Sequence, residues 1–137
     1  MGRVMMGLWI ALAVAVVIMG YIRLAPSDPV VWHQPPEVEA DRDLSNGVLR
    51  RVEAGPEGLE RLDAIISGAP RTAVLAGSVA EGMVTYVTRS AVIGFPDYTT
   101  VRQAGDALHL HARSRFGRSD MGVNAKRVDG WLAALEP

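Results

Sequence analysis

The sequence predicts an α+β protein. An N-terminal transmembrane helix precedes a four-stranded antiparallel sheet with two helices on one face, and the domain has the order α-β-β-β-β-α. One long apolar run stands at the N-terminus, and apolar residues at helical spacing occur around residue 62 and near the C-terminus. Between them lie four short runs rich in Val, Thr and Tyr, joined by turns that are too short for parallel crossovers. We expect a transmembrane anchor over residues 1–23, a linker over 24–54 and one small α+β domain over 55–137.

The apolar run over residues 4–22 is bounded by Arg3 and Arg23 and predicts a helix that crosses a membrane. Such a helix reaches roughly 28 Å, close to the ~30 Å hydrocarbon core of a bilayer. The alternative is a cleaved signal peptide, whose apolar stretch is normally shorter and is followed by small residues at the cleavage site. Arg23 stands where those small residues would be needed, so the flanks favour a retained anchor.

The charges beside this run predict its orientation. Arg3 and the amino terminus outweigh Arg23, which by the positive-inside rule favours a cytoplasmic N-terminus. The C-terminal domain would then lie outside the cytoplasm, which for a bacterial inner membrane means the periplasm. The chain has no cysteine, which fits either side of the membrane.

Residues 24–54 are expected to form a Pro-rich, acidic linker or arm. Half of the eight prolines of the chain lie between Pro26 and Pro36, and such spacing blocks helix and favours extended chain. Acidic residues outnumber basic residues here, as in a solvated spacer. A spacer has no need of Val30, Val31 and Trp32, however, which leaves open that part of the arm docks on the domain.

Apolar spacing and turn residues predict the elements of the domain. The first helix begins near Pro56, buries Leu59 and Leu62, and ends at Gly68. The last helix places Val128 and Trp131 on its apolar face, with Asn124 as its predicted N-cap. The four expected strands cover residues 72–78, 83–93, 98–103 and 107–114.

Alternation along the last strand indicates where charged groups gather. Leu108 and Leu110 point to one face, which the helices should cover, while His109, His111, Arg113 and Arg115 point to the opposite, open face. Clustered guanidinium groups can hold a phosphate, a carboxylate or a lipid headgroup. A simple solvated face is the alternative, and the net charge of −1 argues against nucleic acid as a partner. The candidate anion-binding residues are Arg89, Arg113, Arg115 and Arg118.

The residues predict no catalytic, cofactor or metal site. His109 and His111 could both reach a metal ion, but a third ligand would have to come from a distant segment. Ser119 has no histidine base next to it and no Gly-x-Ser-x-Gly elbow. Ser119 and Asp120 are instead expected to organise the turn into the last helix by accepting backbone N–H groups and pairing with Arg115 or Arg118.

Two segments carry a family resemblance: Gly94-Phe95-Pro96-Asp97, and residues 113–128 with the sequence RSRFGRSDMGVNAKRV. From about residue 24 to 135 the chain resembles the DUF1499 family, whose members have no established activity. The arm over residues 25–33 resembles that of alphaproteobacterial members. Members often have two adjacent acidic residues after the Phe-Pro, whereas Tyr98 follows Asp97 here, which weakens any paired-carboxylate site. The motif residues are Phe95, Pro96, Asp97, Arg113, Ser114, Arg118, Ser119, Asp120, Gly122 and Asn124.

Two interpretations of the loop before the last helix remain open. Either Asp120 fills the N-terminus of that helix and binds the arginines internally, or an external anion does so. We expect a membrane-anchored, non-enzymatic module of the cell envelope that binds a protein partner or an anionic lipid headgroup. The alternative is an enzyme that acts on a phosphorylated or lipid-linked substrate.

Overall fold

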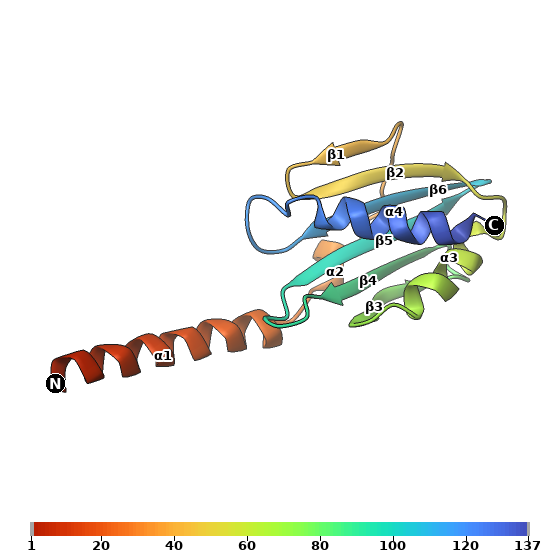
Figure 1. Cartoon of the computed structure of the whole chain (residues 1–137). Helices are drawn as coiled ribbons and strands as arrows, with labels where there is room; N and C mark the ends of the chain where they lie inside the picture. Colours follow the sequence, from red (N-terminus) through yellow and green to blue (C-terminus); the bar gives the residue numbers. More distant parts are fainter. Residues whose placement is uncertain (1, 137) are drawn as a thin grey trace.

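The structure is a computed structural model that describes residues 2–136, and it has an α+β architecture with an N-terminal apolar helix (Figure 1). The helices are α1 (Gly2–Leu24), α2 (Pro29–Trp32), α3 (Gly58–Ser67) and α4 (Val123–Leu135). The strands are β1 (Arg42–Leu44), β2 (Gly47–Glu53), β3 (Thr72–Ser78), β4 (Met83–Arg89), β5 (Pro96–Ala104) and β6 (Ala107–Ser114).

The sheet has six antiparallel strands in the order β1-β2-β6-β5-β4-β3, so the prediction of four strands was wrong. The four expected strands are β3 to β6, and the two additional strands come from residues 42–53, which were expected to be linker. The composition of β2 does not predict a strand, because four of its seven residues are glycine or charged. Its stability comes from antiparallel pairing with β6, in which Gly47 faces Arg113, 66 residues further along the chain. Burial of Val48, which has no exposed surface, adds to it.

The helices α3 and α4 cover one face of the sheet, as predicted from the alternation in β6 (Figure 1). Leu108, Leu110 and Val128 are wholly buried between the layers, and Trp131 is 9% exposed. The side chains of this core come from β2, β4, β5, β6 and both helices.

The opposite face of the sheet is covered by the arm, residues 25–38, and is therefore not the open face that the sequence predicted. The ring of Trp32 stacks on Tyr98 with centroids 4.0 Å apart. The imidazole of His33 lies against β3 at Gly77. A Cβ on Gly77 would lie 2.7 Å from this ring, and the φ of Gly77 is +83°. A side chain at Gly77 would thus clash with the arm and strain the backbone.

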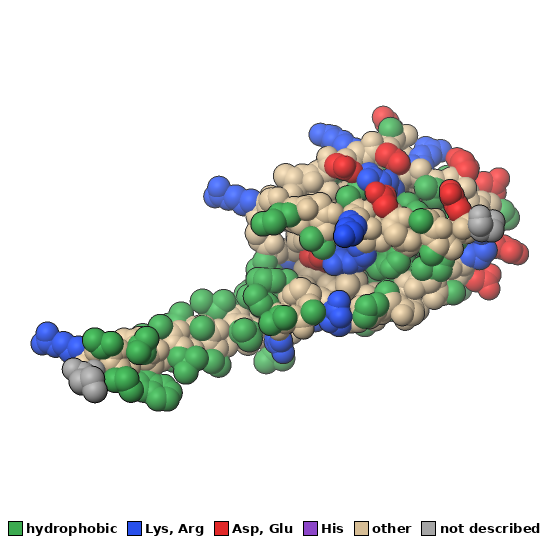
Figure 2. All heavy atoms as spheres, viewed as in Figure 1, with side chains coloured by type: hydrophobic (Ala, Val, Ile, Leu, Met, Phe, Trp, Pro, Cys, Tyr) green, Lys and Arg blue, Asp and Glu red, His purple; other side chains and the backbone are tan. Residues whose placement is uncertain are grey.

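The apolar helix α1 extends away from the domain, and Figure 2 shows its hydrophobic side chains along its length. Its mean hydropathy of 2.3 and its 23 residues make it long and apolar enough to cross a membrane, and a signal sequence would have the same properties. Only Ile22 of α1 is buried. Arg89 donates to the carbonyl of Ile22 (3.3 Å), and Arg23 donates to that of Ile93 (3.0 Å), so the end of α1 contacts the domain directly.

The two edge strands differ from the inner strands in length and regularity. β1 is three residues long, and its ladder with β2 has the same short length. The pairing of β3 with β4 is interrupted by a register shift between Val74 and Ala76. The regular part of the sheet is thus its centre, which carries the residues of the candidate site.

Replacing Trp131 by alanine should lower the free energy of unfolding by about 3–5 kcal/mol, because it empties an aromatic site in the core. Lys126→Ala, at an exposed position of the same helix, should change it by less than about 0.5 kcal/mol. Denaturant titration of both variants measures the difference. Equal stabilities would show that Trp131 does not pack in the core.

Candidate functional site

The candidate site begins with the loop that leads from β6 into α4. The helix starts after Gly122, which has a left-handed φ of +78°. Asp120 accepts from the backbone N–H of Gly122 through Oδ1 (2.9 Å) and from that of Asn124 through Oδ2 (3.1 Å). Asp120 therefore satisfies the first free donors of α4, and the prediction of Asn124 as the N-cap was wrong.

Asp120 is held as an ion by these donors. Burial acts to raise the pKa of the Asp120 carboxyl, but the hydrogen bonds from Asn124 and from the backbone N–H groups bring it below its ordinary value. No arginine pairs with Asp120 among residues 2–136, so the expected pairing with Arg115 or Arg118 is not formed. Asp120 thus fills the N-terminus of α4, as one of the two interpretations of the loop expected. Its side-chain partner is Asn124 and not an arginine.

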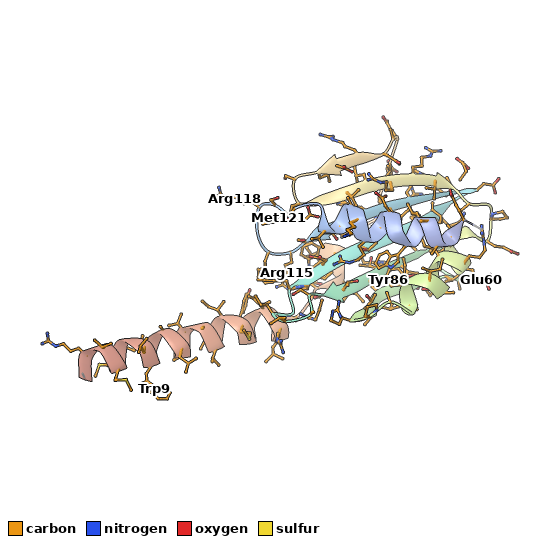
Figure 3. The ribbon with its side chains drawn as sticks, viewed as in Figure 1. Trp9, Glu60, Tyr86, Arg115, Arg118 and Met121 are labelled. Carbon is orange, nitrogen blue, oxygen red and sulfur yellow. The ribbon has the colours of Figure 1, made fainter. Side chains whose placement is uncertain are left out.

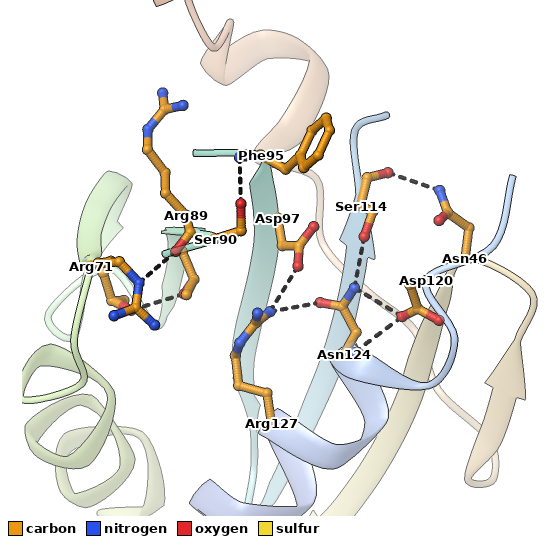
Figure 4. Close-up of polar contacts among 12 residues, drawn as sticks. Asn46, Arg71, Arg89, Ser90, Phe95, Asp97, Ser114, Asp120, Asn124 and Arg127 are labelled. Atoms are coloured by element: carbon orange, nitrogen blue, oxygen red, sulfur yellow. Dashed lines mark hydrogen bonds and ion pairs between the residues drawn. The ribbon is translucent and has the colours of Figure 1, made fainter. Parts of the chain in front are cut away.

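Asn124 is wholly buried and connects the loop to the sheet (Figure 4). Its Nδ2 donates to Asp120 Oδ2 (3.0 Å) and to Ser114 Oγ (3.1 Å), which lies on β6. Its Oδ1 accepts from Arg127 (3.2 Å), one turn further along α4. The backbone of Ser114 exchanges two further hydrogen bonds with Asn46 in the turn between β1 and β2. The amide of Asn124 thus joins three parts of the fold.

Arg127 extends this network to β5. Its Nη1 lies 3.0 Å from Asp97 Oδ2, and the two side chains are only 19% and 11% exposed. Asp97 faces Ser114 across the β5–β6 ladder, so both side chains point to the helices. The carboxylate of Asp97 is therefore neutralised by an arginine of α4. It does not belong to a pair of carboxylates.

Sequence reasoning missed Arg127 and Asn46. The spacing of Arg127, three residues after Asn124, is a signal that places both side chains on one side of a helix. Asn46 has no such signal, because its role depends on the pairing of β2 with β6. The remaining motif residues have local roles: Pro96 opens β5 and accepts from the N–H of Arg115, and Ser119 Oγ accepts from the N–H of Met121 (3.2 Å).

A pocket of about 310 Å³ lies beside the network. Apolar groups of Phe95, Pro96, Phe116 and Val123 form much of its wall, and Asp97, Ser114 and Asp120 supply polar atoms. Its further lining residues are Ser90, Gly117 and Ser119. This volume is at the small end of the range for ligand pockets. Six of the eight motif residues other than the arginines thus line the pocket, and both of its carboxylates already accept hydrogen bonds.

Arg113 is occupied by the arm on the other face of the sheet. Its guanidinium lies 5.4 Å from the centroid of the Trp32 ring and donates to the Trp32 carbonyl. It also donates to Thr100 Oγ1 (3.0 Å) and to the carbonyl of His111 (3.0 Å). Burial lowers the pKa of Arg113 to about 10. Arg113 therefore fastens the arm to the sheet.

The other three candidate arginines lie toward the end of the domain from which α1 emerges. Arg115 donates to the carbonyl of Pro26 (3.1 Å) and to the Tyr98 hydroxyl (3.3 Å), and Arg89 donates to the carbonyls of Ile22 and Gly94. Arg118 is exposed and makes no hydrogen bond or ion pair with residues 2–136. The structure therefore does not gather the four arginines into one stripe.

All three histidines of the chain lie where the arm meets the sheet. His109 Nδ1 accepts from the backbone N–H of Val38 (2.8 Å), and His33 Nδ1 bonds Thr85 Oγ1 (2.7 Å). Burial, helped by Arg102 and Arg51, lowers the pKa of His109 against a smaller effect of nearby glutamates. Burial and Arg113 lower the pKa of His111 to about 4. The face that the arm covers thus holds His109 and His111 with lowered pKa values, which favour their neutral form.

The fold and this network define a single α+β domain behind an apolar helix, with a family motif gathered at one end of its sheet. The chain belongs to the DUF1499 family: the family profile, described as a protein of unknown function, matches residues 27–135 and confirms the resemblance. No curated protein shows significant similarity to the chain.

Asp120→Asn should lower the free energy of unfolding by about 1–3 kcal/mol, because one acceptor oxygen becomes a donor that faces the N–H groups of α4. Asp106→Asn, in the exposed turn between β5 and β6, is the matched control and should have little effect. Thermal melts of the two variants check this expectation. An unchanged midpoint in Asp120→Asn would contradict the capping role.

Acid should destabilise the protein through the histidines under the arm. The pKa of His111 is 6.5 in the unfolded chain and about 4 in the folded protein. The unfolded state therefore binds the proton first, and the folded protein loses stability as the pH falls from 6.5 to about 4. His111→Gln should lose less stability than wild type over the same window. Melts at several pH values measure the two slopes, and identical slopes would contradict the assignment.

Proposed function

We propose that this protein is a single-pass membrane protein whose domain binds the headgroup of an anionic lipid at the bilayer surface, without catalysing a reaction. The observation that carries the proposal is Arg118, which is exposed and makes no hydrogen bond or ion pair with residues 2–136. It lies on the loop that borders the pocket beside the Asn124 network, at the end of the domain that the C-terminal end of α1 contacts. In Figure 3, Arg118 and Arg115 lie on the side of the domain toward α1, whereas Glu60 lies at the opposite end.

The contacts at the end of α1 support a retained anchor over a cleaved signal peptide. Ile22 and Ala25 are each 9% exposed, and Arg23 and Tyr21 contact the loops of the domain. Cleavage behind α1 would remove these contacts and expose the surfaces that they cover. The side chains from Val4 to Met19 have no such partners, which suits a lipid environment.

The chemistry of Arg118 favours an anion. A guanidinium group binds phosphate oxygens through two parallel hydrogen bonds, and a lipid phosphate next to the membrane is the nearest source of such oxygens. The neighbouring α4 terminus is already filled by Asp120, so the arginine side chain and not the helix end would bind the headgroup. The occupied carboxylates of the pocket favour binding over general acid–base catalysis, which needs a free group.

The orientation proposed for the anchor follows from the charges of the sequence. A cytoplasmic N-terminus would place the domain outside the cytoplasm, in the periplasm of a bacterial cell envelope. A reporter fused after the last residue should then be active only outside the cytoplasm. Activity in the cytoplasm would show that the opposite orientation is correct. The lipid-binding proposal is tested separately.

Arg118→Gln should abolish a stabilisation that anionic lipid gives to the full-length protein. Wild type should melt at a higher temperature in phosphatidylglycerol nanodiscs than in phosphatidylcholine nanodiscs, because a ligand of the folded state stabilises it. Arg42→Gln removes the same charge from the edge strand β1 and should keep the full shift. Inorganic phosphate added to the phosphatidylcholine samples separates free phosphate from lipid as the source of the anion.

The result that contradicts the proposal is an equal melting temperature for wild type in both lipids. A shift that both arginine variants lose equally would also contradict it, since that result reflects overall charge and not a site at Arg118. Without added anion, Arg118→Gln should leave stability unchanged or raise it slightly, since no internal partner is lost.

A further inference from the structure

We propose that two loops of the domain, residues 90–95 and 116–122, insert apolar side chains into one leaflet of the bilayer. It is the leaflet from which the C-terminal end of α1 emerges. The inference rests on the anchoring part of the proposed function and goes beyond headgroup binding at Arg118. It assigns an interaction surface whose partner is the acyl region of the membrane and not a protein.

The contacts of α1 place both loops at the membrane surface. Arg23 donates to the carbonyls of Val92 and Ile93, and the ring of Tyr21 meets that of Phe116 edge-on with centroids 6.2 Å apart. The last turn of α1 is therefore in contact with both loops, and no spacer separates the helix from the domain. If α1 spans the bilayer, the loops cannot lie far from the interface where the helix ends.

The side chains around this junction are apolar and exposed. Met121 is 93% exposed, Val92 is 77% exposed and Leu24 is 82% exposed, although they come from three separate segments. Phe95 and Val123 add smaller exposed areas. Large exposed apolar side chains gathered at one end of a domain are typical of a protein or membrane interface. The junction therefore has the composition that burial in acyl chains would require.

The backbone at Met121 supports the same conclusion. Met121 has a φ of +54°, a conformation that side-chain-bearing residues rarely adopt, and glycine would be the usual choice there. A large apolar side chain is thus held outward at a position that disfavours it. Figure 3 shows Met121 and Arg118 on the side of the domain toward α1.

The charges of the two loops are compatible with insertion. Residues 90–95 carry no charge, and Asp120, the acidic residue of the other loop, is 9% exposed and occupied by internal donors. The remaining charges of the two loops and of the last turn of α1 are Arg118 and Arg23, whose long side chains can extend from apolar surroundings to the headgroups. Figure 2 shows the acidic side chains of this view gathered away from α1. No free carboxylate of these loops would enter the acyl region.

Depth-dependent quenching on the full-length protein tests the inference. The chain has no cysteine, so single Met121→Cys and Val92→Cys variants can each be labelled with an environment-sensitive fluorophore in vesicles of phosphatidylcholine that contain acyl-chain spin labels. Both labels should be quenched several-fold more than the same label at Glu60→Cys. A label at Trp9→Cys, within α1, should be quenched most strongly.

Quenching at Trp9 without quenching at positions 121 and 92 would overturn the inference while the anchor stands. The absence of quenching at Trp9 would overturn the anchor and the inference together. Phosphatidylcholine carries no net charge, so failure of anionic headgroup binding at Arg118 would leave the expected quenching unchanged. The two proposals can therefore fail separately.

Discussion

The buried side chain of Asn124 is the interaction on which this end of the domain depends. Its amide has partners in Asp120, Ser114 and Arg127, which come from the loop, from β6 and from α4. A buried amide without these partners would cost more than the hydrogen bonds themselves contribute, so the loop has one low-energy arrangement. The position of the exposed Arg118 and Met121 follows from this arrangement, because both lie on the loop that the amide holds.

The end of β6 connects this network to the arm through neighbouring residues. Ser114 points to the helices and bonds Asn124, while Arg113 points to the other face and holds Trp32. Strand alternation requires adjacent residues to serve opposite faces, so a shift of register by one residue would break both attachments. The Arg-Ser pair of the family motif thus has a structural meaning: one residue fixes the arm that follows α1, and the next fixes the helix that follows the loop.

Local patterns were sufficient to predict much of the fold, and long-range pairing accounts for what they missed. The apolar spacing around Leu62 and Trp131 predicted both domain helices, and alternation in β6 predicted the face that they cover. Residues 42–53 looked like linker because their charges resemble those of a solvated spacer, and only the partner strand makes them a strand. The candidate site was predicted in part: Asp120 does serve the start of α4, but its partner Asn124 was taken for the cap. Arg127 was missed because its partner Asp97 is distant in sequence.

The two edge strands have a consequence for neighbouring copies of the protein. β3 exposes Val74 and has no charged side chain, and such an edge can template the addition of another strand. The register shift after Val74 breaks the regular row of free backbone groups, while β1 at the other edge is short and carries Arg42 and Asp43. Chains that share one bilayer meet at a raised effective concentration. Irregularity at one edge and charge at the other therefore oppose the joining of sheets into larger aggregates.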